Sequence, residues 1–139
     1  MHSPMLAPIV ALIAWTMVMW TWMYATRLPA IRKLGMKLDP EAPRGAQVAT
    51  LPARVRWKAD NYNHLMEQPT LFFALALVLA AVGRDHGWPL VLAWIYVGLR
   101  VVHSLLQATW NKIEVRFSVF FLSSLALIAM IVPAALAVF

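Results

Sequence analysis

Four apolar runs, each long enough to cross a lipid bilayer as a helix, dominate this chain. They lie at about residues 5–26, 52–82, 88–108 and 115–138, and the second begins polar before it turns apolar. About 20 apolar residues suffice for a transmembrane helix. The chain is 62% hydrophobic and 13% charged, whereas soluble domains are roughly 45–50% apolar. The sequence therefore predicts an all-α integral membrane protein, a four-transmembrane-helix bundle in a single domain, 1–139.

The first run is charge-free and carries several Trp and Tyr side chains toward its end, where aromatic anchors at the membrane interface are common. A cleaved signal peptide would have a basic start and a small-residue cleavage site. Neither is visible, so we interpret the run as a retained transmembrane helix. Residues 27–51, rich in proline, glycine and basic side chains, are expected to form a solvated loop that can fold over a site.

The second segment, Arg54 to Val82, begins with basic and amide side chains and then becomes apolar. On a helix, Arg56, Asp60, Asn63 and Glu67 share one face, which forms a polar stripe leading into the membrane. Because such a stripe is costly against acyl chains, it is expected to face protein or water. The stripe indicates a small-ligand site. The alternative is a helix tip whose charges are solvated in the headgroup layer.

The third and fourth segments add a second polar group. Arg100, His103, Ser104 and Gln107 fall on one face of the third helix, and Arg116 lies in the first turn of the fourth. Pro69 is expected to bend the second helix where its polar half meets its apolar half.

The distribution of basic residues predicts the topology. They concentrate in the first connector and its helical extension and around the third connector, whereas the turn between the second and third spans holds only Arg84. The positive-inside rule then places both basic connectors in the cytoplasm and both termini outside. The polar side chains expected to meet near the cytoplasmic face are Arg56, Asn63, Glu67, Arg100, His103, Gln107 and Arg116.

These side chains suit a small, zwitterionic, net anionic ligand. Arginines bind carboxylates in bidentate fashion, Glu67 can accept an ammonium, and Asn63 and Gln107 can pair with peptide groups. Arg116, at a helix N-terminus, would lower the pKa of a bound thiol and so favour the reactive thiolate. The alternative for Arg116 is an anchor to lipid headgroups, and for His103 a packed histidine that hydrogen-bonds between helices.

The sequence argues against several kinds of functional site. The absence of cysteine excludes disulfides, cysteine catalysis and cysteine metal sites. The four histidines are too scattered in sequence to indicate a metal site. Nucleic acid binding is not expected despite the net charge of +6, because the basic residues sit at the membrane surface.

Two motifs resemble those of the membrane-associated proteins in eicosanoid and glutathione metabolism, the MAPEG family. One is the Arg-rich stretch at 53–72, in which an asparagine and a glutamate precede a proline and an apolar run. The other is Leu99-Arg-Val-Val-His-Ser104, followed by Arg116. The resemblance covers nearly the whole chain. The chain looks like a bacterial-type member similar to microsomal glutathione transferases, which implies the bacterial inner membrane as its location.

The resemblance implies a homotrimer whose second helices line the centre, with glutathione bound between neighbouring subunits as co-substrate. It implies that Arg56, Asn63 and Glu67 contact glutathione, that Arg100 and His103 support the site, and that Arg116 stabilises the thiolate. Gln107 stands where a tyrosine is common among the enzymes of the family. Besides glutathione, the implied partners are membrane lipids and a lipophilic small-molecule substrate.

Two function hypotheses follow. The first is a glutathione-dependent membrane enzyme that conjugates lipophilic electrophiles, reduces lipid hydroperoxides or isomerises a lipid. The second is a non-catalytic membrane module that keeps the family scaffold and binds lipid or a partner protein. Two residues favour the second hypothesis: Gln107, at the place where a tyrosine is common among the enzymes, and Phe117, at a place where a hydroxyl could assist a thiolate.

Overall fold

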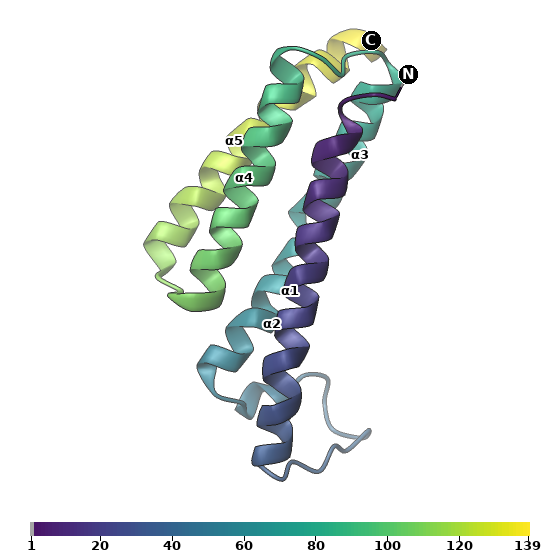
Figure 1. The fold of residues 1–139 in the computed structure, drawn as a ribbon. Helices are drawn as coiled ribbons and strands as arrows, with labels where there is room; N and C mark the ends of the chain where they lie inside the picture. Colours follow the sequence, from purple (N-terminus) through teal and green to yellow (C-terminus); the bar gives the residue numbers. More distant parts are fainter. Residues whose placement is uncertain (1) are drawn as a thin grey trace.

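The structure, a computed structural model, describes residues 2–139 as a bundle of long helices (Figure 1). Its helices are α1 (Leu6–Lys33), α2 (Ala53–Leu65), α3 (Gln68–Ala81), α4 (Trp88–Thr109) and α5 (Ile113–Val138), with a short 3-10 helix η1 (Val48–Thr50) in the first connector. Over the described residues, four helical segments are long and apolar enough to cross a membrane, α2 and α3 together forming one of them. The predicted four-helix membrane bundle is confirmed.

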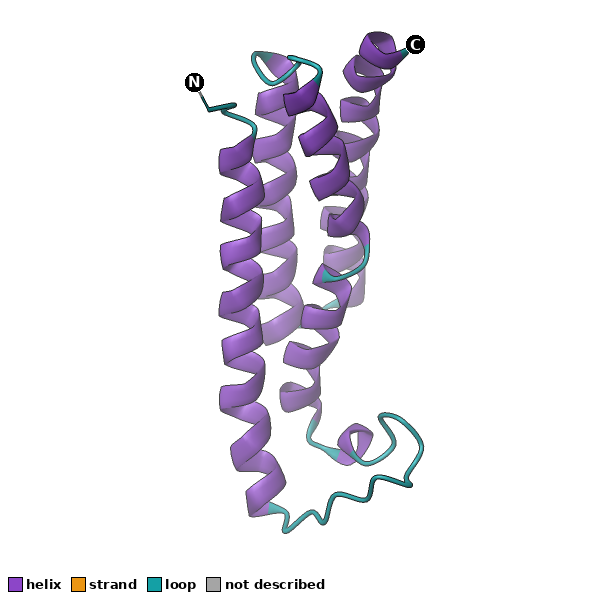
Figure 2. Cartoon of the chain, turned by 90° about the vertical axis from the view of Figure 1, so that its right-hand side faces the viewer, coloured by secondary structure: helices purple, strands orange, loops and turns teal. Residues whose placement is uncertain are grey.

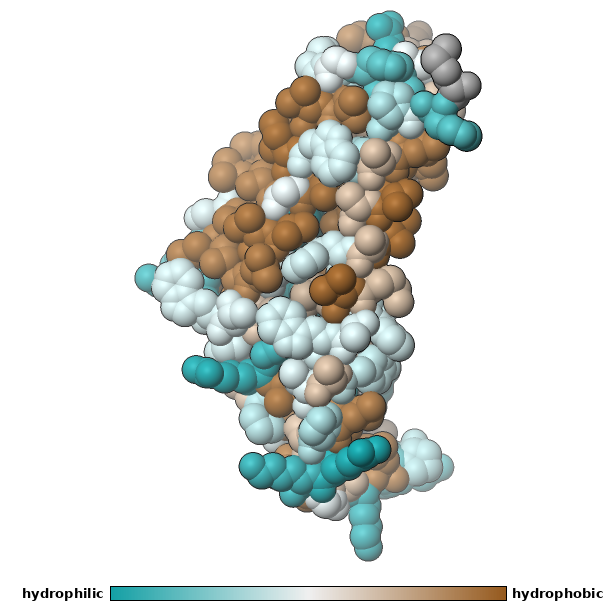
Figure 3. Space-filling model, viewed as in Figure 1, coloured by the Kyte–Doolittle hydropathy of each residue, from teal (hydrophilic) through white to brown (hydrophobic). Residues whose placement is uncertain are grey.

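The two ends of the bundle differ. Both termini and the α3–α4 turn lie at one end, whereas the α1–α2 connector and the α4–α5 turn lie toward the other, here called the connector end (Figure 1). There, α1 and α2 project beyond the α4–α5 turn, and the connector loops beside them (Figure 2). Apolar side chains cover the middle of the face shown in Figure 3, and hydrophilic side chains gather at its ends. This distribution fits a bundle whose middle is embedded in lipid and whose ends are solvated.

The first helix is longer than the sequence predicted. It continues through Pro29 to Lys33, whereas a loop was expected from residue 27. The helix then ends in a Schellman motif around Gly35, whose φ is 58°. The Gly35 N–H donates to the carbonyl of Arg32 at 3.1 Å, and the next N–H donates to the carbonyl of Ile31 at 3.2 Å. This glycine cap, together with cations in the last turn that favour the helix dipole, explains the extra turns.

The second span is interrupted where a continuous helix was expected. α2 ends at Leu65 and α3 begins at Gln68. Pro69 lacks an N–H, so it cannot bond the carbonyl four residues earlier, and its ring disfavours the helical path there. The prediction of a bend near Pro69 located the disturbance, but the chain leaves helical geometry at Glu67, with ψ near −100°. Glu67 therefore sits on an unwound turn inside the span.

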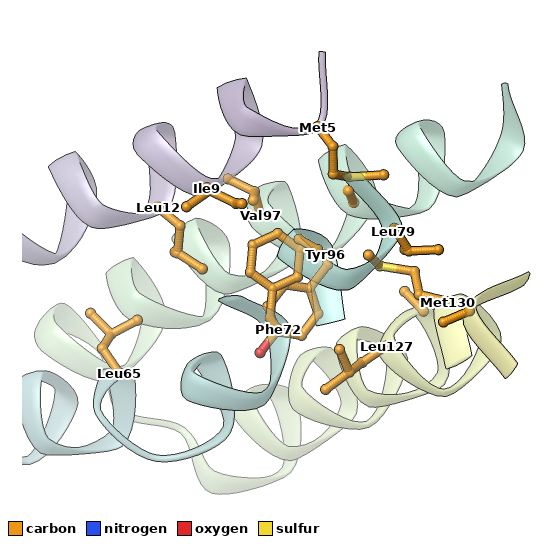
Figure 4. Close-up of a cluster of buried hydrophobic side chains, with 14 of the residues drawn as sticks. Met5, Ile9, Leu12, Leu65, Phe72, Leu79, Tyr96, Val97, Leu127 and Met130 are labelled. Carbon is orange, nitrogen blue, oxygen red and sulfur yellow. The ribbon is translucent and has the colours of Figure 1, made fainter. Parts of the chain in front are cut away.

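Side chains from all spans meet in the core (Figure 4). The rings of Phe72 and Tyr96 stack with centroids 4.6 Å apart, and both residues are fully buried. Beside them, Gln68 Nε2 donates to the Ser124 hydroxyl at 2.8 Å, and the Tyr96 hydroxyl donates to Gln68 Oε1 at 3.3 Å. Closer to the connector end, the buried side chains of Asn61 and Ser104 exchange two hydrogen bonds of 2.8 and 3.0 Å. These bonds fix α2 against α4.

Replacing Asn61 by leucine is expected to lower the free energy of unfolding by about 1–2 kcal/mol, because Ser104 loses both bonds across the helix pair. The free energy of unfolding of parent and variant is measured in mixed detergent micelles. Thr21→Ala is the matched control, since the Thr21 hydroxyl is exposed and donates to the Met17 carbonyl of its own helix at 2.9 Å. Equal stability of the two variants would show that the Asn61–Ser104 pair does not hold α2 in place.

Candidate functional site

A cavity of about 300 Å³ opens between α2, α4 and α5 toward the connector end. This volume is at the lower end of the range for small-molecule pockets, roughly 300–1,000 Å³. Its lining combines charged and amide side chains with an apolar wall. The lining residues are Asp60, His64, Glu67, His103, Gln107, Ile113, Arg116, Phe117 and Phe120. We call this cavity the α2–α4–α5 pocket.

Four of the predicted site residues line this pocket. Glu67 comes from the unwound turn between α2 and α3, His103 and Gln107 from the buried face of α4, and Arg116 from the first turn of α5. The predicted helical spacing on α4 thus brings His103 and Gln107 to one cavity. The α4–α5 turn folds Arg116 back beside them, because only a few residues separate the two helices.

Arg116 is held in place by the turn that precedes its helix. Its Nη1 donates to Asn111 Oδ1 at 2.6 Å. Asn111 has φ of 53°, in the left-handed region that asparagine and glycine tolerate best. One residue therefore both turns the backbone between α4 and α5 and orients the half-buried guanidinium toward the pocket.

Asn111→Gly separates these two roles, because glycine keeps the left-handed backbone and removes the side-chain acceptor. If Arg116 acts on a bound ligand, this variant is expected to lose activity by about 10-fold or more, since small displacements of a catalytic group are costly. Its thermal stability in detergent should stay close to that of the parent. Steady-state turnover beside a melting curve checks this, and full activity would mean that Asn111 does not position Arg116.

Arg100 lies behind the pocket wall rather than on it. The residue is fully buried, and its Nη2 donates to the His64 carbonyl at 3.2 Å near the end of α2. The guanidinium also stands over the Phe120 ring, 5.7 Å from its centroid. Among the described residues, the Arg100 Nε and Nη1 have no hydrogen-bond partner. Arg100 therefore caps a helix end and adds positive potential behind the cavity, where an anion would offset an otherwise costly buried cation.

Arg56 and Asn63 occupy the other side of α2. They line a separate cavity of about 230 Å³ between α2 and the first connector, together with Arg27 and Asp60. Arg56 Nε donates to the Leu51 carbonyl at 3.0 Å. Within one chain, the predicted polar stripe is thus divided between two cavities, and Asp60 lines both. The Asn61–Ser104 bonds set this rotation of α2.

His64 was missed as a site residue. Its Nδ1 lies 2.9 Å from Glu67 Oε2, and its ring is 4.9 Å from the His103 ring, centroid to centroid. His64 and His103 lie far apart in the sequence, and the fold brings their rings together. The available signal was the i,i+3 spacing of His64 and Glu67, which allows a side-chain pair even where a helix ends.

Fold and site define a class: helical membrane proteins with four spans and a cation-bearing pocket at one end of the bundle. The model of the MAPEG family matches residues 5–136, and the chain belongs to this family. No curated protein and no solved structure matches it.

Proposed function

We propose that this protein is a glutathione-dependent membrane enzyme that acts on lipophilic electrophiles as a transferase, a hydroperoxide peroxidase, or both. MAPEG membership suggests a glutathione-related membrane function. The observation that carries the proposal is Arg116, oriented by Asn111 toward a polar pocket with an apolar wall.

The charges of the pocket suit glutathione, which carries carboxylates, an ammonium, peptide groups and a thiol. Arg116 and the field of Arg100 attract the anionic ligand, and the exposed carboxylate of Glu67 can accept its ammonium. Gln107 offers an amide that pairs with a peptide group. Arg56 and Asn63 would contribute from a neighbouring subunit, so their separate cavity favours a site completed in a homotrimer.

The chemistry follows from a cation beside a thiol. Arg116 and the free N–H groups of the first turn of α5 stabilise the thiolate relative to the thiol. In conjugation, the sulfur forms a bond to an electrophilic carbon, and the leaving group departs with its electron pair. In peroxide reduction, the thiolate sulfur attacks one oxygen of the O–O bond, the alkoxide departs with the electron pair and takes up a proton, and the sulfur is left as a sulfenic acid. The thiol of a second glutathione then forms the disulfide with this sulfur and releases water. Ile113, Phe117 and Phe120 form the apolar wall against which a lipophilic substrate packs.

The setting of this chemistry is also proposed. The connector end, with its many basic residues, would face the cytoplasm of a bacterium, and both termini would lie outside the inner membrane. Glutathione would then enter from the aqueous side, and the lipophilic substrate would enter laterally from the bilayer.

Isothermal calorimetry of the detergent-purified protein tests the binding step. Glutathione is expected to bind, and an analogue with the thiol replaced by a methyl group should bind more weakly at alkaline pH, because it cannot form the thiolate that Arg116 favours. The conjugation of chlorodinitrobenzene and the reduction of cumene hydroperoxide then report the chemistry.

A second candidate is a non-catalytic membrane module with the same scaffold. One observation favours this module: none of the residues that line the pocket carries a side-chain hydroxyl that could assist a thiolate. Gln107 and Phe117 line the pocket together with Arg116 instead. The absence of glutathione binding at any pH and ionic strength would support this module and exclude the enzyme.

A further inference from the structure

The α2–α4–α5 pocket contains a histidine–carboxylate pair as well as the guanidinium of Arg116. His64 Nδ1 and Glu67 Oε2 are 2.9 Å apart. Because an ionised carboxylate can only accept, the neutral ring carries its proton on Nδ1 and donates this N–H to the Glu67 carboxylate in a hydrogen bond. The other nitrogen, Nε2, then keeps its lone pair. A base oriented by a third group is the recurring arrangement by which proteins activate a weak nucleophile.

We propose that His64 is the general base of the site: its Nε2 takes the proton from the thiol of bound glutathione, and Glu67 holds the ring for this transfer. The inference rests on the proposed function, since glutathione supplies the thiol. In the step, the S–H bond breaks, its electron pair stays on sulfur, and the proton moves to Nε2. The imidazolium is stabilised by the Glu67 carboxylate, and the thiolate by Arg116. The proton later passes to water or to the departing anion.

Geometry selects His64 rather than His103. Both residues line the pocket, but of these two histidines only His64 has a hydrogen-bonded carboxylate among residues 2–139. His103 is almost fully buried, and its neighbours include the His64 ring at 4.9 Å and the Phe120 ring at 6.2 Å. A ring without an acceptor for its second N–H is a poor site for a proton in apolar surroundings. His103 therefore packs behind His64 and limits its rotation.

The charges around His64 couple the protonation of its ring to the deprotonation of the bound thiol. The charged and titratable groups that face His64 come from each element packed around it. They are Asp60 on α2, Glu67 on the α2–α3 turn, Arg100 and His103 on α4, and Arg116 on α5. The positive charges of Arg100 and Arg116 oppose a positive charge on the His64 ring, whereas the negative charge of Glu67 favours it. A proton on His64 is therefore best tolerated when a thiolate lies in the pocket, so that binding and proton transfer occur together.

The experiment compares His64→Gln with His86→Gln in the full-length protein in detergent. His86 also lies beside a carboxylate, with Nδ1 2.5 Å from Asp85 Oδ1, but at the opposite end of the bundle. The ultraviolet absorbance of the glutathione thiolate is titrated with pH, and glutathione affinity and turnover are measured in parallel. His64→Gln is expected to move thiolate formation to higher pH and to lower turnover about 100-fold or more, with its affinity for glutathione changed less than about 3-fold. His86→Gln should follow the parent.

The outcomes separate the two proposals. If the parent forms thiolate and His64→Gln titrates and turns over as the parent does, the base assignment is wrong and the proposed function stands. If the parent neither binds glutathione nor forms thiolate, the proposed function fails and the base assignment fails with it. Should His64→Gln not fold, Glu67→Gln keeps the imidazole and removes its charged partner. It is expected to shift thiolate formation in the same direction, and an unshifted titration would contradict the role of the pair.

Discussion

Replacing Arg116 by alanine is expected to lower glutathione-dependent turnover by about 100- to 1,000-fold, the usual cost of losing one preorganised group that stabilises a developing anion. The physical reason is local. The Arg116 guanidinium is held by Asn111 at 2.6 Å in the first turn of α5, so in the proposed mechanism it would meet the thiolate without reorganisation. The loss should appear mainly in turnover with chlorodinitrobenzene and less in glutathione affinity, because other cations remain near the site.

Arg84→Ala is the matched control for that experiment. Arg84 is exposed in the α3–α4 turn at the opposite end of the bundle, so its removal changes the net charge equally but leaves the pocket intact. Parent-like turnover is expected for this variant. Undiminished turnover in Arg116→Ala would remove Arg116 from the mechanism and would favour the role of a headgroup anchor.

Replacing Phe72 by alanine is expected to cost about 3–5 kcal/mol of unfolding free energy, the usual range for a buried phenylalanine. Phe72 is fully buried and stacks on Tyr96 with ring centroids 4.6 Å apart (Figure 4). Its loss leaves a cavity where α3 meets α4 and removes the contact that steadies the Tyr96 hydroxyl against Gln68. The unfolding of the variant in mixed micelles measures this cost.

Phe121→Ala removes the same side chain from an exposed position of α5, where 52% of the residue is accessible. A change within about 0.5 kcal/mol is expected for this control. Similar losses for the two variants would mean that the Phe72–Tyr96 stack is no more important than a surface contact.

The spans were predictable because the length and apolarity of a run suffice to define a transmembrane helix. The ends of the helices were not, because they depend on single caps. Gly35 ends α1 a full turn and more beyond the expected boundary, and Glu67 leaves helical geometry before Pro69. In α1 the helical hydrogen bonding continues after the apolar run has ended, whereas in the second span it stops although the sequence passes smoothly from polar to apolar.

The candidate site was also predictable only in part. Helical spacing alone brings His103 and Gln107 to one face of α4, and the short turn before α5 adds Arg116. The rotation of α2 depends on a hydrogen-bonded pair between helices, Asn61 with Ser104, and long-range pairs of this kind are not visible in one sequence. This rotation directs Arg56 and Asn63 to a different cavity, and it brings His64 beside His103.

The most direct measurement is a density map of the protein with glutathione bound. A ligand whose sulfur lies within about 4–6 Å of the Arg116 guanidinium, the range in which a cation strongly favours an anion, is the predicted result. Its peptide backbone should run between α2, α4 and α5. Glutathione bound elsewhere, or a pocket filled only by lipid under saturating glutathione, would contradict the account.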